Sequence, residues 1–302
     1  MTEVSVVMSV YNGETQVRNT LMSLEAQIGL SPEIIVVNDG SEDKTTEILD
    51  DFAYPRSNIH IIHQSNKGLT AALIRGCAAA RGHYIARQDS GDISAPNRLI
   101  KQVQTLETNP DASMISCATR FSDQEGYFLY EMFPQPAIPQ DVSIESPPHH
   151  GSVMFRKKDY QQAGGYRSEF YVAQDLDLWS RLQAMGSHIC LDEVLYEATV
   201  DPGSITSSRR HIQQQVANLS EQIMRERRAG RSEQAILNQI QSVSREDPLA
   251  PRIGLADYHY FIAGCLRRSL PERARHHYRE AIRSNPTHLR AMARYLQLLL
   301  KT

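Results

Sequence analysis

In the N-terminal third of the chain, short apolar runs typical of strands alternate with segments whose apolar positions have helical spacing. Residues 4–10 form an almost unbroken apolar run, typical of a strand covered on both faces of a sheet, and residues 33–37 and 59–63 carry similar β-rich runs. Between them, residues 15–27 and 69–80 carry apolar side chains at helical spacing. Strand and helix in this alternation predict an α/β fold with a doubly wound sheet and right-handed crossovers.

Two acidic turns follow strands of this predicted sheet. Asp39 comes directly after the strand at residues 33–37, and Asp89 and Asp92 come after a further predicted strand at residues 83–86. Ligands of doubly wound sheets bind at the carboxyl ends of the strands. We therefore expect both turns at the edge of the sheet where a ligand binds.

The pattern weakens in the middle of the chain. Strand-like segments occur at residues 113–117 and 127–133, and a proline-rich stretch continues to Pro148. We expect a flexible loop beside the site between residues 111 and 148. Periodicity then returns in three predicted elements: a strand at 152–155, a helix at 175–185 and a strand at 188–196.

The composition changes after Pro202 and Gly203. The remaining residues are rich in Gln, Arg, Ala and Leu at helical spacing, with almost no strand pattern. The sequence thus predicts an α/β domain over residues 1–204 and an all-α C-terminal extension over residues 205–302. Within the extension, four residues have a spacing similar to one tetratricopeptide helix pair, although such repeats normally occur in stacks of three or more: Ala274, Tyr278, Ala281 and Ala291.

Charge is distributed unevenly between the two parts. Residues 1–203 carry 15 basic and 27 acidic side chains, whereas residues 204–302 carry 17 basic and 8 acidic ones. A basic extension is suited to contact anionic lipid at a membrane surface, or to self-association through the acidic part of the molecule. Nucleic acid is not expected as a partner, because basic and aromatic residues are not interleaved as they are in nucleic-acid-binding motifs.

The chain also lacks several other features. Its N-terminus has neither the basic segment nor the cleavage site of a signal peptide, and no apolar run reaches the roughly 18 residues of a membrane-spanning helix. The four cysteines form no CxxC pair, so neither a zinc site nor a disulfide framework is indicated. These features predict a cytoplasmic protein, which the basic extension could hold at the inner membrane surface.

The acidic turns suggest how a phosphorylated ligand is held. The chain has no GxGxxG motif after the first strand and no GxxxxGK[ST] motif, which disfavours a dinucleotide enzyme or a P-loop kinase. A divalent cation bound by carboxylates can neutralise a diphosphate instead, and Asp89 and Asp92 lie on one tight turn. A solvated acidic turn that caps the next helix remains the alternative for this pair, as does an ordinary Asp-Gly turn for Asp39.

Four segments, in order, resemble the family 2 glycosyltransferases of the bacterial polysaccharide type. They are residues 5–13 (SVVMSVYNG), 33–41 (EIIVVNDGS), 82–99 (GHYIARQDSGDISAPNRL) and 164–179 (GGYRSEFYVAQDLDLW). The resemblance covers about residues 3–203 and implies the GT-A fold, a Rossmann-like nucleotide-binding domain built on a doubly wound mixed sheet. It further implies a hexosyltransferase-type enzyme that transfers a sugar, with inversion, from a nucleoside diphosphate donor to a hydroxyl of a glycan or a lipid-linked acceptor. A UDP-sugar is the favoured donor.

The resemblance also assigns the donor-binding residues. It places Ser9, Tyr11 and Glu14 of the first segment, together with Asp39, at the nucleoside part of the nucleotide sugar. Asp89 opens the metal-binding DxD motif and contributes to the same nucleotide-sugar site.

This DxD motif departs from the family pattern in one position. Gly91 stands where the family commonly has an aspartate, so the requirement for Mn²⁺ or Mg²⁺ is left open. We expect Asp92 to take over as metal ligand beside Asp89. The family often has a histidine near His150, whose imidazole is a ready ligand, although a polar loop anchor is the alternative.

An inverting transfer requires a general base on the acceptor side of the sugar. The position of Asp175 in the family's acidic motif assigns it this role, while Asp177 is expected to cap the helix or orient its neighbours. Without the resemblance, both acids would simply complement the dipole at a helix N-terminus.

Two other functions remain. A sugar nucleotidyltransferase would carry a basic residue in the loop after the first strand, and residues 9–14 contain none. A catalytically decayed GT-A scaffold that acts through its helical extension is kept open by Gly91, while Asp39 and Asp175 argue against it.

Overall fold

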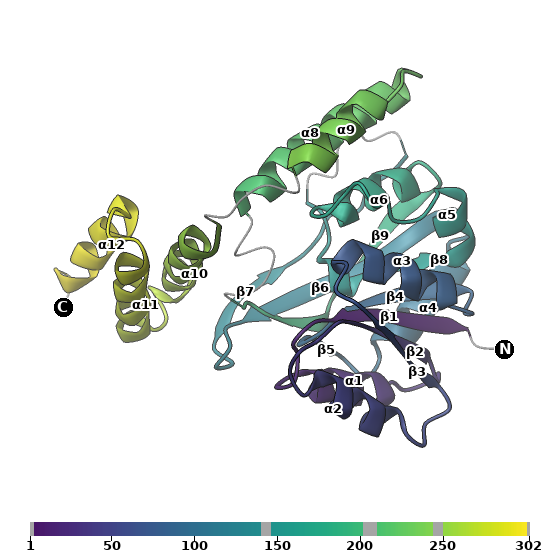
Figure 1. Ribbon diagram of the computed structural model, residues 1–302, viewed down its shortest axis with the longest axis horizontal. Helices are drawn as coiled ribbons and strands as arrows, with labels where there is room; N and C mark the ends of the chain where they lie inside the picture. Colours follow the sequence, from purple (N-terminus) through teal and green to yellow (C-terminus); the bar gives the residue numbers. More distant parts are fainter. Residues whose placement is uncertain (1–2, 140–145, 202–209, 244–249, 301–302) are drawn as a thin grey trace.

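The computed structural model describes residues 3–139, 146–201, 210–243 and 250–300. Its centre is a mixed β-sheet in the order β3-β2-β1-β4-β8-β6-β9-β5, with β7 paired to β6 (Figure 1). The strands are β1 (Val4–Val10), β2 (Glu33–Asp39), β3 (Ile59–Gln64), β4 (Tyr84–Asp89), β5 (Ile93–Ser94), β6 (Ala112–Ser122), β7 (Phe128–Met132), β8 (Met154–Arg156) and β9 (Ser187–Thr199).

Strand direction divides the sheet into two halves. Strands β1 to β4 are mutually parallel. Strand β8 runs antiparallel to both β4 and β6, and β6 is parallel to β9. The carboxyl ends of β1, β2, β4, β6 and β9 therefore lie at one edge. The predicted doubly wound mixed sheet is confirmed.

Helices cover both faces of the sheet. Alternate side chains of β1 point to opposite faces, so Val6 and Met8 belong to one apolar cluster and Val7 to the other. The first cluster is covered by α1 (Val17–Glu25), α2 (Thr45–Ala53) and α4 (Arg98–Thr108). The second is covered by α3 (Leu69–Ala79), α5 (Lys157–Gln162) and α6 (Gln174–Gln183).

The middle of the chain is more regular than its sequence suggests. Residues 112–132 contain the long strand β6 and its antiparallel partner β7, where we expected strand-like segments at residues 113–117 and 127–133 within a flexible loop. Strand β6 continues five residues beyond the predicted segment, and it buries polar side chains. Their hydroxyls are satisfied internally, since Ser113 Oγ donates to the carbonyl of Leu182 at 2.8 Å and Ser116 Oγ lies 2.8 Å from His188 Nε2. Residues 140–145 lie outside the described part.

The described part of the C-terminal extension consists of helices and their connections. These are α8 (Arg210–Arg228), α9 (Gln234–Val243), α10 (Ala250–Leu266), α11 (Pro271–Ser284) and α12 (Leu289–Leu299). None of the described helices is both long enough and apolar enough to cross a membrane. The predicted boundary near residue 205 falls outside the described residues, so the division into two domains stays a prediction.

The extension contacts the α/β part in two places (Figure 1). Helices α8 and α9 lie beside α6 and share an apolar cluster with residues 170–173. Helices α10 to α12 share another cluster with β6, β7 and β9. The residues that suggested a tetratricopeptide pair are buried in this second cluster, as the inner positions of α11 and α12: Ala274, Tyr278, Ala281 and Ala291.

Candidate active site

The loop after β1 is tied to the turn after β2. The backbone N–H of Asn12 donates to Ser41 Oγ at 3.0 Å, and that of Gly13 donates to Thr45 Oγ1 at 2.8 Å. Glu14 Oε2 accepts from the backbone N–H of Lys44 at 3.0 Å. The predicted donor-binding residues Glu14 and Tyr11 therefore differ: the Glu14 carboxylate is hydrogen-bonded within the protein, whereas the Tyr11 side chain is exposed.

The side chains of Tyr11 and Ser9 lie at the carboxyl end of β1. Tyr11 is 48 % exposed, and Ser9 is half-buried. Ser9 pairs in register with Val37 of β2 on one side and with Asp89 of β4 on the other. The strand register thus brings the predicted residues of three segments to one edge of the sheet.

Asp39, at the end of β2, is buried and organises the next loop. Its Oδ1 accepts from Gln64 Nε2 at 2.7 Å and from the backbone N–H of Lys67 at 2.9 Å. Its Oδ2 accepts from the backbone N–H of Gly68 at 2.8 Å. The adjacent Gly40 has a positive φ of 75°, and a Cβ there would meet a backbone nitrogen at 2.6 Å. Asp39 therefore holds the loop between β3 and α3 in a fixed conformation.

A buried arginine lies directly under Asp89. Arg87 and Asp89 are two residues apart on β4, so their side chains share a face, and Arg87 Nη2 donates to Asp89 Oδ1 at 2.8 Å. The other donors of Arg87 reach the carbonyls of Val7 and Gln88 and His150 Nε2. Every branch of this buried guanidinium has a partner, which is the condition under which a buried charge is tolerated.

The two aspartates of the turn have opposite pKa shifts. Burial disfavours the charged form of Asp89, but the positive charges of Arg87 and Arg98 hold the pKa of Asp89 below its usual value. Burial, and then the negative charge of Asp89, raise the pKa of Asp92 well above its usual value. Asp92 is fixed in place by the backbone N–H of Thr199, which donates to its Oδ1 at 3.1 Å.

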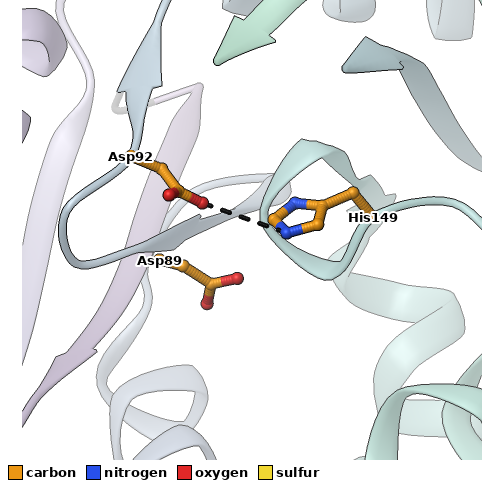
Figure 2. A group of neighbouring side chains, drawn as sticks. All are labelled: Asp89, Asp92 and His149. Atoms are coloured by element: carbon orange, nitrogen blue, oxygen red, sulfur yellow. Dashed lines mark ion pairs between the residues drawn. The ribbon is translucent and has the colours of Figure 1, made fainter. Parts of the chain in front are cut away.

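Asp89, Asp92 and His149 point toward one another (Figure 2). One ligand atom from each lies within 4.8 Å of the others, and Asp92 Oδ2 is 4.0 Å from His149 Nε2. Burial lowers the pKa of His149, which favours the neutral imidazole that can bind a metal. Its buried Nδ1 has no hydrogen-bond partner in the structure. Two carboxylates and an imidazole, with one ring nitrogen unsatisfied, fit a divalent cation.

His150, the histidine expected at the metal, lies elsewhere. Its Nε2 is 2.7 Å from the hydroxyl of Tyr166 and accepts from Arg87 Nε at 3.2 Å. Burial and the neighbouring Arg87 lower the pKa of His150 to about 3, so its ring is neutral. The structure thus brings His149, rather than His150, to the two carboxylates, and gives His150 the role of supporting Arg87.

Gly91 separates the two aspartates in a left-handed backbone conformation. Its φ is +99°, and its N–H donates to Thr20 Oγ1 at 2.9 Å. An ordinary L-residue is strained at such a φ. Gly91 therefore gives the turn the shape that turns Asp92 back toward Asp89.

Asp175 lies at the start of α6, facing the same edge. It is half-buried, and burial, together with the negative charge of Asp89, raises its pKa. Charge coupling of this kind requires the two carboxylates to be near each other. Ala173, two residues earlier, adopts a left-handed conformation with φ of +54°, which is unusual outside glycine and marks a constrained approach to α6.

Asp177, two residues further along the helix, is the centre of a buried ion-pair network. It accepts hydrogen bonds from Arg167 and from Arg181, whose Nη2 lies 2.6 Å from Asp177 Oδ2. Arg167 continues the network to Glu233, before α9, at 2.9 Å. The helix that carries Asp175 is therefore tied to the C-terminal extension.

The sequence of the α/β part also matches a known protein family. A model of the family described as "Glycosyl transferase family 2" matches residues 5–164. The chain belongs to glycosyltransferase family 2. EpsE of Bacillus subtilis (strain 168), named as a glycosyltransferase, is 33 % identical over 66 % of this chain and 73 % of its own. The amylovoran biosynthesis glycosyltransferase AmsE of Erwinia amylovora is 28 % identical over 68 % of this chain and 79 % of its own.

Solved structures show the same fold. The Staphylococcus aureus TarS 1–349 structure in complex with UDP-GlcNAc matches with a TM-score of 0.57 at 17 % identity, over 91 % of this chain and 88 % of that one. The mannosyltransferase PcManGT of Pyrobaculum calidifontis, in complex with GDP-Man and Mn²⁺, matches with a TM-score of 0.58 at 16 % identity, over 99 % and 85 %. This glycosyltransferase therefore has the GT-A fold.

Sequence reasoning missed several residues of the glycosyltransferase site. Arg87 could have been found, because a charged residue two positions before Asp89 in an apolar strand must share its face. Tyr196, whose hydroxyl accepts from the backbone N–H of Asp89 at 3.0 Å, lies 107 residues away in the sequence. Nothing local in the sequence signals that contact, and the same holds for Thr199 at Asp92.

Proposed function

We propose that this glycosyltransferase transfers a sugar, with inversion, from a nucleoside diphosphate donor to a hydroxyl of a glycan or lipid-linked acceptor. The observation that carries the proposal is the cluster of Asp89, Asp92 and His149 at the carboxyl edge of the sheet, with Asp175 near enough to Asp89 for the two carboxylates to interact. Donors of this class are also the ligands in the TarS and PcManGT structures, which contain UDP-GlcNAc and GDP-Man. A UDP-sugar is our favoured donor, and we place the reaction in the cytoplasm.

On the donor side, we assign the nucleoside to the pocket bordered by Ser9, Tyr11, Glu14 and Asp39. The exposed ring of Tyr11 offers a stacking surface, and the loop ordered by Asp39 forms the opposite wall. The backbone conformation of both loops is set by side-chain hydrogen bonds before any ligand arrives. Such preorganisation reduces the entropy lost on binding.

At the diphosphate, Asp89, Asp92 and His149 would hold the cation. A donor set of two carboxylates and one imidazole suits Mn²⁺ better than Mg²⁺, which prefers an all-oxygen shell. A bound cation would supply charge neutralisation for the leaving diphosphate. Arg87, beneath Asp89, keeps that carboxylate ionised and ready to bind it.

On the acceptor side, we assign Asp175 as the general base. Its carboxylate takes the proton of the acceptor hydroxyl as the oxygen bonds to the anomeric carbon and the bond to the diphosphate breaks. A raised pKa makes a carboxylate a stronger base at neutral pH, which improves proton transfer. Attack from the side opposite the diphosphate inverts the anomeric configuration.

Calorimetric titration with UDP-GlcNAc and GDP-mannose, with and without Mn²⁺, tests the donor assignment. One nucleotide sugar should bind in a Mn²⁺-dependent manner, and Asp89→Ala should weaken its binding by at least about tenfold, since it removes a charged ligand. The matched control is Asp175→Asn, which should bind the donor as well as the wild type. Retention of affinity in Asp89→Ala would contradict the metal assignment.

The same experiment separates the proposal from an inactive scaffold. Gly91, in place of the usual acid, is the observation that favours the scaffold. If no nucleotide sugar binds with or without Mn²⁺, the scaffold is supported. If one binds, turnover in the presence of Asp175 and its loss in Asp175→Asn establish the enzyme, and the anomeric configuration of the product, read by NMR, decides between inversion and retention.

A further inference from the structure

The last helix of the chain has two apolar faces. The inner one packs into the cluster shared with β6, β7 and β9, through Ala291, Tyr295 and Leu298. The second lies on the opposite side of the helix, and we call it the α12 outer face. It consists of Leu289 and the residues four, seven and eleven positions after it, which are Ala293, Leu296 and Leu300. All four are exposed.

The α12 outer face is unusually open to solvent. Leu289 is 74 % exposed, Leu296 57 % and Leu300 87 %. A stripe of three exposed leucines and an alanine along one face of a helix marks a surface suited to contact another apolar surface.

Charge along the helix indicates what that surface is. Helix α12 contains Arg290 and Arg294 and no acidic residue. Helical spacing places both arginines on the same flank of the helix, Arg290 nearer the outer face and Arg294 nearer the packed face, and neither takes part in an ion pair within the described part of the chain. An apolar stripe bordered by cations is the pattern of a helix that adsorbs to an anionic lipid surface.

A second copy of the chain fits this face less well. In a two-fold symmetric contact, the same face of both copies meets, so α12 would pack against α12. Arg290 and Arg294 of the two copies would then come together without an acidic residue on either helix to offset them. Like charges at an interface oppose association, whereas anionic headgroups attract both arginines.

The helices that carry the α12 outer face lie at the same edge of the sheet as the candidate active site. The cluster that holds α10 to α12 includes Cys117, Phe121 and Tyr196, all in the carboxyl halves of β6 and β9. The hydroxyl of Tyr196 also bonds to the backbone of Asp89. Helices α10 to α12 therefore stand at the same edge of the sheet as the active site.

We propose that the α12 outer face docks this protein on a membrane surface that contains anionic phospholipids. The leucines insert among the acyl chains, while Arg290 and Arg294 contact the phosphates. Docking by this face brings the active-site edge toward the lipid, which suits the lipid-linked class of acceptor. Only this last point rests on the proposed function, because docking itself requires neither donor nor acceptor.

Co-sedimentation of the full chain with phosphatidylcholine vesicles, with and without phosphatidylglycerol, tests the docking. We expect binding to the phosphatidylglycerol vesicles that weakens as salt is added. Leu296→Glu should lower the partition coefficient by at least about tenfold, because it removes a leucine that would insert among the acyl chains and adds a negative charge that the anionic lipid repels. Replacing Arg290 or Arg294 by Gln should lower it about fivefold each.

The matched control is Met22→Glu on α1. Met22 is as exposed as Leu296, at 56 %, but lies in a helix on the α/β part. Its replacement should leave vesicle binding unchanged, and all variants should retain the wild-type circular dichroism spectrum and donor affinity. Equal loss in Met22→Glu and Leu296→Glu would overturn the proposal.

Two further outcomes would also overturn it. One is the failure of the wild type to bind phosphatidylglycerol vesicles at low salt. The other is a wild-type dimer in analytical ultracentrifugation that Leu296→Glu converts to a monomer, since the face would then be an interface between copies. Neither outcome bears on the transferase activity, because donor binding is measured on the same variants without lipid.

Discussion

The donor half and the acceptor half of the site are built in different ways. The donor half, on β1 to β4, is held by backbone N–H groups that bond to nearby side chains, such as Gly68 to Asp39 and Gly13 to Thr45. The acceptor half places Asp175 on α6, and this helix is tied through Asp177 to Glu233 of the extension. The proposed donor half is therefore shaped by the sheet itself, whereas the position of Asp175, the proposed base, depends on a distant segment.

This difference assigns a role to the helical extension. Asp177 is buried with Arg167 and Arg181, so removal of any one leaves an uncompensated charge in a dry environment. Ala173, with its strained backbone just before α6, needs surrounding structure to hold it. Helices α8 and α9 supply that structure, so the extension helps to hold Asp175, the base that we propose, in position.

The largest effect is expected at Asp175. In Asp175→Asn, the rate of sugar transfer should fall by about a thousandfold, because an amide cannot accept the proton of the acceptor hydroxyl. Donor affinity, measured by calorimetry, should stay within about twofold of the wild type, since the donor half is shaped without α6. A parallel loss of donor affinity would show that the two halves are not independent.

The pH dependence of the wild type sharpens the same test. Burial, and then the negative charge of Asp89, raise the pKa of Asp175, and the base is active only when ionised. The value of kcat/KM should therefore fall as pH drops through a pKa above the usual carboxylate value of about 4. The residual activity of Asp175→Asn should lack this acid limb. An unchanged limb in the variant would assign the titration to another group.

Next in size is the ion-pair network of Asp177. Asp177→Asn should lower the free energy of unfolding by about 3–5 kcal/mol, because Arg167 and Arg181 lose their shared buried carboxylate. Glu233→Gln is the matched control, since this more exposed partner should cost about 1 kcal/mol or less. Thermal and urea unfolding measure both. Equal losses would mean that the network acts through Glu233 rather than through the buried carboxylate.

The two halves also differ in how far the sequence alone predicts them. Residues 33–37 predict β2 well, because a strand buried on both faces must be apolar. Strand β6 was predicted only at residues 113–117. Its continuation through residues 118–122 is fixed by pairing with β7 and β9, which a sequence does not display. Periodicity reports local burial of apolar groups, and it does not report which strands pair.

The site shows the same limit. The turn with Asp89 and Asp92 is predicted by its position after a strand, which is a local property. His149 was not predicted, because the direction of each ring in the pair His149-His150 is set by Arg87 and the tertiary fold. The ion pairs that link Asp177 to Glu233 through Arg167 join distant parts of the sequence, so no sequence motif predicts them.

A smaller effect is expected at Glu33, at the end of β2 opposite the proposed donor site. Burial would raise the pKa of Glu33, but hydrogen bonds from Ser5 and from the backbone and side chain of Arg81 lower it. The ionised form therefore stabilises the fold above the carboxylate pKa of the unfolded chain, about 4.3, and this stability is lost as pH falls through the folded pKa. Glu33→Gln should cost about 1–3 kcal/mol at pH 7.

Urea unfolding across pH measures this contribution. The difference in unfolding free energy between the wild type and Glu33→Gln should be constant near pH 7 and shrink below about pH 4. Glu25→Gln, which alters a more exposed ion pair with Arg56, is the control and should change little at any pH. A difference that persists at low pH would show that Glu33 acts by packing rather than by charge.

The smallest effect on stability, and the sharpest contrast between the halves, is expected at two glycines. Gly91, in the metal turn, and Gly126, in the β6–β7 connection, have similar positive φ values of 99° and 83°. A Cβ at Gly91 would meet only the flexible side chain of Gln16, at 3.3 Å, and one at Gly126 would meet nothing within 4 Å. Replacement by Ala should thus cost about 1–2 kcal/mol at either site, from backbone strain alone. Only Gly91→Ala should also weaken Mn²⁺-dependent donor binding in calorimetry, because the turn that contains Gly91 orients Asp89 and Asp92. Equal donor affinity in both variants would show that the conformation of this turn does not affect metal binding.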